Sequence, residues 1–324
     1  MKFAVATGKR KWMYPTPQGA VEENSQDSCP NAHPGNASDE ILNGWAVGIL
    51  KEGAGWYQVV THYGYQGYVS GKGLLLVSAE ELMERDHKGE MCIVDRGAAD
   101  LLAEPGVRAR ILKTLPKGSF VRRMGEAADG YGRAELADGS RGYLPLVSLR
   151  RRRDSDEFLY RGSTAGDFLK QREKKKGWVK READLRKRLT ANARSWLGIQ
   201  YRWGGKSGEG IDCSGLVFMS YLFEGILIYR DAVLREGYPV KGIHPKEARM
   251  GDLLYFPGHV AMYLGDGKYI HSTGNERSFG CVINSLKRED AEYRQDLAAK
   301  LLGAGSIFDG KEHLGAVLLE KNMR

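Results

Sequence analysis

The first half of the chain repeats itself, and this repeat limits the folds that it can adopt. Residues 55–69, GWYQVVTHYGYQGYV, align without gaps with residues 130–144, GYGRAELADGSRGYL, at an offset of 75 positions. Each copy has short runs rich in β-branched and aromatic residues between glycine-bearing turns, a pattern typical of antiparallel strands. The repeat therefore predicts two copies of one small all-β barrel.

The second copy is the more regular of the two. Its stretch RILKTLPKGSFVRRMGEAADGYGRAELADGSRGYL resembles a bacterial SH3 domain along its whole length. The first copy contains the polar segment VEENSQDSCPNAHPGNASDE, which we expect to form an irregular arm. We predict SH3-like barrels over residues 1–78 and 88–150.

Basic residues concentrate after the second copy. The chain has 49 Lys and Arg against 41 Asp and Glu, a net charge of +8, with much of the excess in residues 150–153 and 170–188. Interleaved charges predict a solvated, partly helical connector over residues 151–185. The alternative is attraction to a polyanion such as an anionic cell-wall surface. No nucleic-acid-binding signature accompanies the charge, so we expect no nucleic-acid partner.

The cysteines and the hydropathy pattern exclude other classes. Cys29, Cys92, Cys213 and Cys281 lie far apart with no CxxC pair, which argues against a zinc ribbon and against a dense disulfide framework. No window is apolar enough for a secretory leader or a membrane span. We expect no membrane insertion and a cytoplasmic protein, or a periplasmic or secreted one if a leader has been removed.

The last part of the chain has a different pattern. LTANARSWLG places Leu189, Ala193, Trp196 and Leu197 on one helical face. An apolar helix follows in GIDCSGLVFMSYLF, and then come three strand-like stretches, GDLLYF, HVAMYLGDGKYIHST and CVINSL. A helix that leads into an antiparallel sheet predicts an α+β domain over residues 186–324.

Cys213 is the first candidate functional residue. Asp212 is a suitable N-cap for the apolar helix, which puts Cys213 in the first turn, where unpaired N–H groups and the helix dipole favour a thiolate. The alternative is a buried cysteine that only packs. The local sequence favours neither, because a nucleophile also needs a base.

Two histidines flank a predicted hairpin downstream. If residues 265–267 form a three-residue loop, His259 and His271 lie on one face of the hairpin, whereas a two-residue loop of Asp266 and Gly267 puts them on opposite faces. Only the first arrangement lets them share a site. A thiolate, a histidine base and a third group that orients the base are the parts of a cysteine hydrolase.

These motifs resemble a known family. YRWGGKSGEGIDCSGLV, GDLLYF and GHVAMYLGDGKYIHS are similar to the NlpC/p60 family of bacterial cell-wall cysteine peptidases over residues 185–285. The resemblance implies a papain-like α+β domain in which Cys213 is the nucleophile, His259 the base and His271 the orienting group. It also implies that Tyr201 lies beside the oxyanion site, and that no metal or organic cofactor is needed.

A narrower resemblance concerns the substrate. Two SH3-like barrels before the peptidase domain, together with GILIYRDA, resemble the γ-D-glutamyl-L-diamino acid endopeptidases, which act on released murein peptides with a free N-terminal L-Ala. This implies a role in cell-wall recycling or degradation, with Asp231 binding the amine and Ser214 contacting the peptide. It also implies that Glu40 and Tyr65, or else Tyr63, close the pocket from the first barrel. Tyr229 stands where the subfamily has Pro.

Three rival functions remain. A secreted endopeptidase would act on intact peptidoglycan, with the barrels as wall anchors. A wall-binding protein would carry an inert peptidase domain, although the complete set of Cys213, His259 and His271 argues against this. An acyltransferase could use the same fold and would differ in its products.

Overall fold

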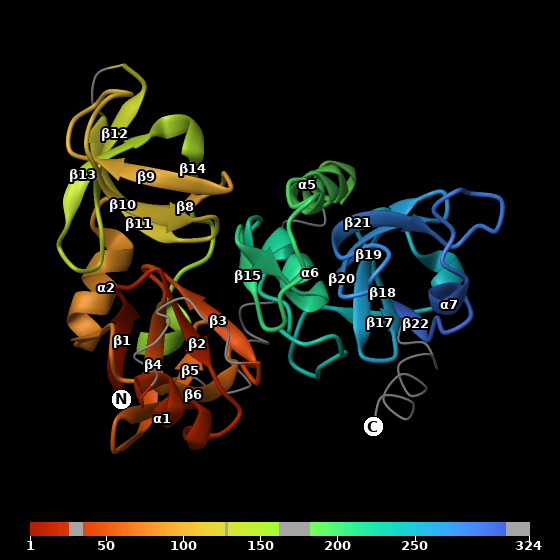
Figure 1. Cartoon of the computed structure of the whole chain (residues 1–324), viewed down its shortest axis with the longest axis horizontal. Coiled ribbons are helices and arrows are strands. Elements are labelled where there is room, and N and C mark those ends of the chain that lie inside the picture. Colours follow the sequence, from red (N-terminus) through yellow and green to blue (C-terminus); the bar gives the residue numbers. More distant parts are fainter. Residues whose placement is uncertain (26–34, 127–128, 162–181, 309–324) are drawn as a thin grey trace. The chain divides into compact units, whose positions relative to one another are not determined.

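The computed structural model describes residues 1–25, 35–126, 129–161 and 182–308, which are mostly β-structure with a few short helices (Figure 1). The chain divides into two compact units. Unit 1 comprises Met1–Ser163 and Trp203–Glu209, and unit 2 comprises Thr164–Arg202 and Gly210–Arg324. Residues 203–209 were predicted to belong to the last domain, whereas their contacts group them with unit 1. No helix among the described residues has the length and hydrophobicity to span a membrane.

The first sheet of unit 1 has the strand order β6-β5-β4-β1-β7. Its strands are β1 (Lys2–Ala6), β4 (Ala46–Gly53), β5 (Trp56–Thr61), β6 (Gln66–Ser70) and β7 (Leu74–Val77). A smaller sheet pairs β2 (Arg10–Met13) with β3 (Asp39–Leu42), and helix α1 (Pro17–Ser25) lies between them in the chain. Buried Trp12, Tyr14, Ala20 and Ala37 form one hydrophobic cluster of this region.

The second sheet of unit 1 has the order β10-β9-β13-β12-β11-β8-β14. Its strands are β8 (Glu90–Val94), β9 (Ala98–Leu102), β10 (Ile111–Pro116), β11 (Phe120–Glu126), β12 (Tyr131–Glu135), β13 (Arg141–Pro145) and β14 (Leu149–Arg151). Helix α2 (Ala79–His87) connects the two sheets and begins with a capping box between Ser78 and Glu81. The short helices η1 (Leu146–Ser148) and α3 (Glu157–Tyr160) complete this part.

The predicted repeat is confirmed in the hairpins of the two sheets. Trp56 pairs with Ser70 in the first sheet, and Tyr131 pairs with Pro145 in the second, so both partners are shifted by the same 75 positions. The turn glycines also correspond, because Gly55 and Gly130 have φ of 79° and 78°. Glycine adopts this left-handed conformation without the steric cost that a side chain brings.

Arg152 was predicted to lie in a solvated connector, and this prediction is wrong. Its guanidinium is buried and donates to Asp154 at 2.9 Å and to Asp156 at 2.8 Å. It also lies 4.1 Å from the ring centroid of Phe120. These carboxylates replace the water that the arginine loses on burial. Most of the predicted connector, residues 162–181, lies outside the described residues.

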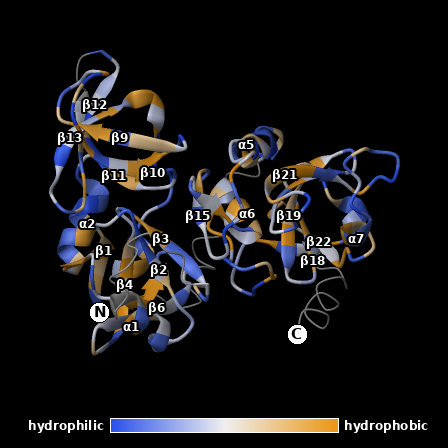
Figure 2. Cartoon of the chain, in the orientation of Figure 1, coloured by the Kyte–Doolittle hydropathy of each residue, from blue (hydrophilic) through white to orange (hydrophobic). Residues whose placement is uncertain are grey.

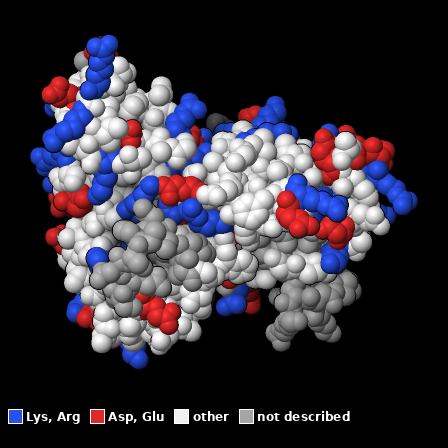
Figure 3. All heavy atoms as spheres, viewed as in Figure 1, with Lys and Arg blue, Asp and Glu red and all other residues white. Residues whose placement is uncertain are grey.

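Charged side chains are distributed over both units. On the face drawn in Figure 3, Lys and Arg are interspersed with Asp and Glu. The predicted attraction to an anionic surface stays a prediction, since residues 162–181 carry much of the basic excess and are not described.

Unit 2 is built on a six-stranded sheet with the order β17-β22-β18-β19-β20-β21. Its strands are β17 (Lys241–Ile243), β18 (Leu253–Phe256), β19 (His259–Gly265), β20 (Lys268–Thr273), β21 (Gly280–Ser285) and β22 (Gly303–Ser306). The remaining elements are the helices α5 (Glu182–Arg194), α6 (Cys213–Leu222), η3 (Pro245–Glu247) and α7 (Gln295–Ala298), and the two-residue strands β15 (Lys206–Ser207, in unit 1) and β16 (Gly210–Ile211).

Helices α5 and α6 differ in hydropathy (Figure 2). Every residue of α6 is buried, and α6 contacts α5, β19 and β20. Helix α5 buries Leu189 and Ala193, as predicted, but it ends at Arg194. Trp196 is fully buried beyond its end and Leu197 is 44% exposed, so the prediction of one helical face through residue 197 is wrong.

The β19–β20 hairpin closes differently from the prediction. Gly265 pairs with Lys268, which leaves a two-residue turn of Asp266 and Gly267 with φ of 51° and 75°, as in a type I′ turn. Tyr263 pairs with Tyr269, so a bulge at Leu264 shifts the register by one residue. The prediction of a three-residue loop is therefore wrong. Beyond the bulge, however, the strands pair in the same register that a three-residue loop would have produced.

Candidate active site

Cys213 is the first residue of α6. The Asp212 carboxylate accepts a hydrogen bond from the N–H of Gly215 at 2.5 Å, so the predicted N-cap is confirmed. Burial raises the pKa of the Cys213 thiol to about 12, and the Asp212 charge adds to this, while the N–H groups of Val260 and Ser214 and the Arg230 charge oppose it. The expectation of a readily ionised thiol is therefore wrong for the substrate-free protein, because burial outweighs the helix terminus.

Arg230 holds the helix start in place, and the sequence analysis did not identify it. Its buried guanidinium donates to the two carboxylate oxygens of Asp212, each at 3.0 Å. It also donates to the Ser214 hydroxyl at 2.8 Å, and this hydroxyl in turn donates to Asp212 at 3.1 Å. The resemblance implied that Ser214 contacts the peptide through its backbone or its hydroxyl, and the hydroxyl is hydrogen-bonded within the protein.

The two histidines share a site, as the prediction required. His259 Nε2 lies 2.7 Å from His271 Nδ1, and His271 Nε2 lies 2.8 Å from Asn284 Oδ1. The Asn284 amide donates through Nδ2 to the carbonyl of Glu292 at 3.1 Å, which fixes its orientation. Asn284 Oδ1 can only accept, so His271 Nε2 carries a proton and His271 Nδ1 is an acceptor.

His259 is the donor in its contact with His271. Because His271 Nδ1 accepts, His259 Nε2 carries a proton, and the lone pair of neutral His259 is at Nδ1. Burial lowers the pKa of His259 to about 3, with a further contribution from His271, and burial lowers the pKa of His271 to about 4. Both imidazoles are therefore neutral at neutral pH, and His259 has an unprotonated nitrogen that can accept a proton from a thiol.

Asn284 is a second functional candidate that the sequence analysis missed. It lies in β21, inside the stretch CVINSL, and pairs with Tyr269. Tyr269 is two residues before His271, so Asn284 and His271 lie on the same face of the sheet. A search for polar residues on the strand next to His271 would have found it.

Tyr201 lies close to the nucleophile, as the resemblance implied. It forms an isolated bridge with Ile211, two residues before Cys213. Burial raises the pKa of Tyr201 above its usual value, and the neighbouring Cys213 and Asp212 add to the shift. The Tyr201 hydroxyl therefore stays protonated and can donate a hydrogen bond beside the sulfur.

Asp231 lines a narrow pocket of unit 2 together with Val217 and Val260. Val217 lies one helical turn after Cys213, and the N–H of Val260 is directed at the Cys213 sulfur. The pocket therefore begins beside the nucleophile, which is the location expected for a residue that binds substrate.

Glu40 and Tyr63 lie in unit 1, where both contact Lys206. Glu40 accepts from the N–H of Lys206 at 2.8 Å, while the Lys206 ammonium donates to Asp39 at 2.9 Å and to the Tyr63 hydroxyl at 2.5 Å. Lys206, Asp39 and Glu40 are fully buried, and Tyr63 is almost so. Tyr65 is half-buried and closes a turn with Thr61 through its backbone. Glu40 and Tyr63 are thus both hydrogen-bonded to Lys206 of the same chain.

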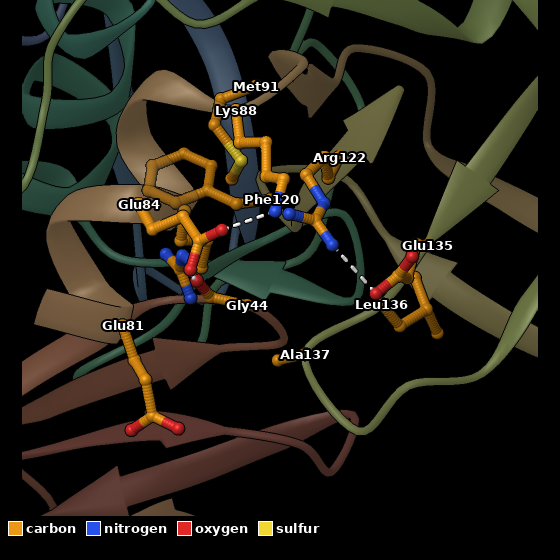
Figure 4. A pocket seen from close by; sticks show the side chains of 11 residues that line it. Gly44, Glu81, Glu84, Lys88, Met91, Phe120, Arg122, Glu135, Leu136 and Ala137 are labelled. Atoms are coloured by element: carbon orange, nitrogen blue, oxygen red, sulfur yellow. Dashed lines mark hydrogen bonds and ion pairs between the residues drawn. The ribbon is translucent and has the colours of Figure 1, made fainter. Parts of the chain in front are cut away.

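A second cavity, of about 340 Å³, lies in unit 1 (Figure 4). Its charged side chains are largely paired with one another, since Arg122 donates to Glu135 at 2.8 Å and Lys88 pairs with Glu84. Arg85 donates to the carbonyl of Gly44 at 2.7 Å and to Asp156 at 3.0 Å. None of the predicted site residues lines this cavity.

The other cysteines stand apart from this chemistry. Cys92 and Cys281 are buried and are not joined by a disulfide, and Cys29 lies outside the described residues. Among the residues that the structure describes, no three His, Cys, Asp or Glu side chains gather in a group that could hold a metal ion.

Comparisons with known proteins identify the family of the region that contains this site. The NlpC/P60 family matches residues 198–295, which include Cys213, His259, His271 and Asn284. A relative named dipeptidyl-peptidase 6 from Lysinibacillus sphaericus is 34% identical over 279 residues, covering 83% of this chain and 92% of that protein. The chain belongs to the NlpC/P60 family.

Other members match smaller parts or only the fold. A γ-D-glutamyl-L-lysine dipeptidyl-peptidase from Bacillus cereus is 41% identical over 100 residues, and the match spans 28% of this chain and 29% of that protein. The structure of an NlpC/P60 family protein from Bacillus cereus covers 95% of this chain and all of its own, with a TM-score of 0.69 at 18% identity. At this low identity the match shows that the two chains share a fold and nothing more.

Proposed function

We propose that this protein is a cysteine endopeptidase that hydrolyses the bond between γ-D-glutamate and an L-diamino acid in murein peptides with a free N-terminal L-Ala. The observation that carries the proposal is the chain of contacts from Asn284 through His271 to His259, whose neighbour Val260 directs its N–H at the Cys213 thiol at the start of α6. This set of groups suits nucleophilic acyl transfer.

The reaction begins from a neutral thiol and a neutral imidazole. The Cys213 sulfur attacks the γ-carbonyl carbon of the glutamate while His259 Nδ1 takes the thiol proton. N–H groups in the first turn of α6 and the Tyr201 hydroxyl stabilise the negative oxygen of the tetrahedral intermediate. His271 accepts from His259 Nε2 and so stabilises the imidazolium that forms.

Protonated His259 then gives its proton to the leaving amine of the diamino acid, which departs and leaves a thioester on Cys213. Water attacks this thioester while His259 accepts a proton from the water. Collapse of the second intermediate releases L-Ala-D-Glu and returns the proton to the sulfur. Every step uses only groups of this chain and water.

Two further observations support the substrate assignment. Asp231 lies in the pocket beside the nucleophile, where a carboxylate can bind an ammonium group. The relatives from Bacillus are named for cleavage next to a γ-D-glutamyl group.

We assign both repeated β units of unit 1 to the bacterial SH3 type, on the resemblance of residues 110–144 and on the shared hairpin register.

Mass spectrometry of the products tests the proposal. We expect L-Ala-γ-D-Glu-L-Lys, or its diaminopimelate counterpart, to yield L-Ala-D-Glu and the free diamino acid, and the N-acetylated peptide to stay intact. Cys213→Ala is the inactive control. Equal cleavage of the free and acetylated peptides would overturn the amine requirement, and release of peptides from intact sacculi would favour a wall-lytic enzyme instead.

A further inference from the structure

The pocket that contains Asp231 has a second charged residue, Arg235, at its wall. We call it the Asp231 pocket, and its aromatic side is formed by Tyr229 and Tyr238. Its volume of about 10 Å³ corresponds to about one water molecule. A peptide would therefore bind across the mouth of this pocket rather than inside it, where Arg235 is exposed.

Tyr229 contacts both charged groups, and Tyr238 packs against Tyr229. The Tyr229 hydroxyl hydrogen-bonds the Asp231 carboxylate, and the guanidinium of Arg235 lies 5.5 Å from the centroid of the Tyr229 ring. The rings of Tyr229 and Tyr238 lie 5.2 Å apart. Burial raises the pKa of Tyr229, and the Arg235 charge opposes this rise. Tyr229, which departs from the proline of the resembled subfamily, thus provides the surface on which Arg235 stacks.

Arg235 is exposed and in this differs from the buried, paired arginines of the protein. Within the described part of the chain, no carboxylate lies at salt-bridge distance from its guanidinium, whereas Arg230, Arg186 and Arg152 each have one. Arg235 is exposed to solvent and also lines the pocket. A planar guanidinium in this state is suited to a carboxylate of a ligand.

We propose that Arg235 binds the free α-carboxylate of the γ-linked D-glutamate while Asp231 binds the N-terminal amine. The inference rests on the proposed function, because a γ-linked glutamate keeps its α-carboxylate and the alanine before it keeps its amine. Both charges lie on the acyl side of the bond that Cys213 attacks. One acidic and one basic residue beside the nucleophile therefore match the two charges of this half of the substrate.

The proposal predicts discrimination by charge at the α-carboxyl group. A charge-assisted hydrogen bond to a carboxylate contributes about 10-fold to 100-fold in kcat/KM. The enzyme should therefore cleave L-Ala-γ-D-Glu-L-Lys faster, by this factor, than the same peptide with an α-carboxamide, in which the glutamate is D-isoglutamine.

Four measurements of kcat/KM test this, with wild type and Arg235→Gln each acting on both peptides. We expect Arg235→Gln to lose about 10-fold to 100-fold on the carboxylate peptide and almost nothing on the amide. Arg235→Lys should recover part of the loss. Arg249→Gln is the matched control, because its guanidinium is 66% exposed and pairs with Glu182 elsewhere in unit 2.

The outcomes separate the inference from the proposed function. Equal rates of wild type on both peptides, or an equal loss on both in Arg235→Gln, would overturn the role of Arg235 and leave the peptidase activity standing. If wild type cleaves neither peptide, the proposed function fails and the inference fails with it. An unchanged melting temperature of Arg235→Gln shows that the loss is not one of folding.

Discussion

The guanidinium of Arg230 forms two hydrogen bonds to the carboxylate of Asp212, both at 3.0 Å, in a buried pair. Asp212 caps the helix that starts with Cys213, and Asp231 follows Arg230 in the chain. One ion pair therefore positions both the candidate nucleophile and the candidate substrate-binding carboxylate.

Arg230→Lys should impair catalysis. Lysine keeps the charge but cannot form the planar pair of hydrogen bonds, so we expect kcat/KM to fall about 10-fold to 100-fold. Steady-state kinetics on the tripeptide measure this, with thermal unfolding as the check on folding. Arg188→Lys is the control, since that pair with Glu224 involves an arginine side chain that is 43% exposed. Full activity of a folded Arg230→Lys variant would show that the pair has no positioning role.

Substitution of Asn284 should act through His271. In Asn284→Asp the carboxylate accepts from His271 more strongly and raises its pKa above the present value of about 4. We therefore expect activity to persist, with the acidic limb of the pH–rate profile moved to higher pH. In Asn284→Leu no acceptor remains, and kcat should fall about 10-fold or more. Identical profiles for wild type and Asn284→Asp would contradict the proton assignment.

The buried histidines should make unit 2 sensitive to acid. Burial lowers the pKa of His259 to about 3 and of His271 to about 4, from 6.5. Between pH 6.5 and about 4 the unfolded chain therefore binds protons that the folded chain does not, so the free energy of unfolding falls as the pH falls.

Chemical unfolding at several pH values in this window measures the slope. The double variant His259→Gln/His271→Gln should show a shallower slope than wild type, with a remaining part from His62, whose pKa burial also lowers. His87→Gln, at the exposed end of α2, is the control. The same slope in wild type and the double variant would refute the assignment.

Lys206 should be important for the stability of unit 1. Lys206→Met leaves the fully buried Asp39 without the ammonium and should lower the free energy of unfolding by about 3–5 kcal/mol. Lys206→Met/Asp39→Leu should regain much of this loss, because the buried charge is gone. Lys113→Met is the matched control, since Lys113 and Asp138 are 29% and 30% exposed and their pair contributes about 0–1 kcal/mol. Equal stability of Lys206→Met and Lys113→Met would contradict the account.

Local signals predicted much of this architecture. The spacing of turn glycines predicted the repeat, because Gly55 and Gly130 need the same left-handed backbone. Asp212 before an apolar run predicted the start of α6, because a short acidic side chain caps a helix. The shared face of His259 and His271 was also predicted, although from the wrong loop.

Features that depend on distant residues were not predicted. The bulge at Leu264 changes the register by one residue, and two loop lengths fit the same sequence. The pairing of Arg230 with Asp212 and of Lys206 with Asp39 joins segments with no common pattern. The high pKa of Cys213 arises from burial in the folded unit, whereas the sequence shows only the helix terminus, which acts in the opposite direction.

The mass of the intact protein, quenched during turnover of L-Ala-γ-D-Glu-L-Lys, tests the central role of Cys213 most directly. We predict a fraction of the wild type with one added L-Ala-D-Glu acyl group, which peptide mapping places on Cys213, and no adduct in Cys213→Ala. Turnover by Cys213→Ala at the wild-type rate, or an acyl group on another residue, would contradict the account.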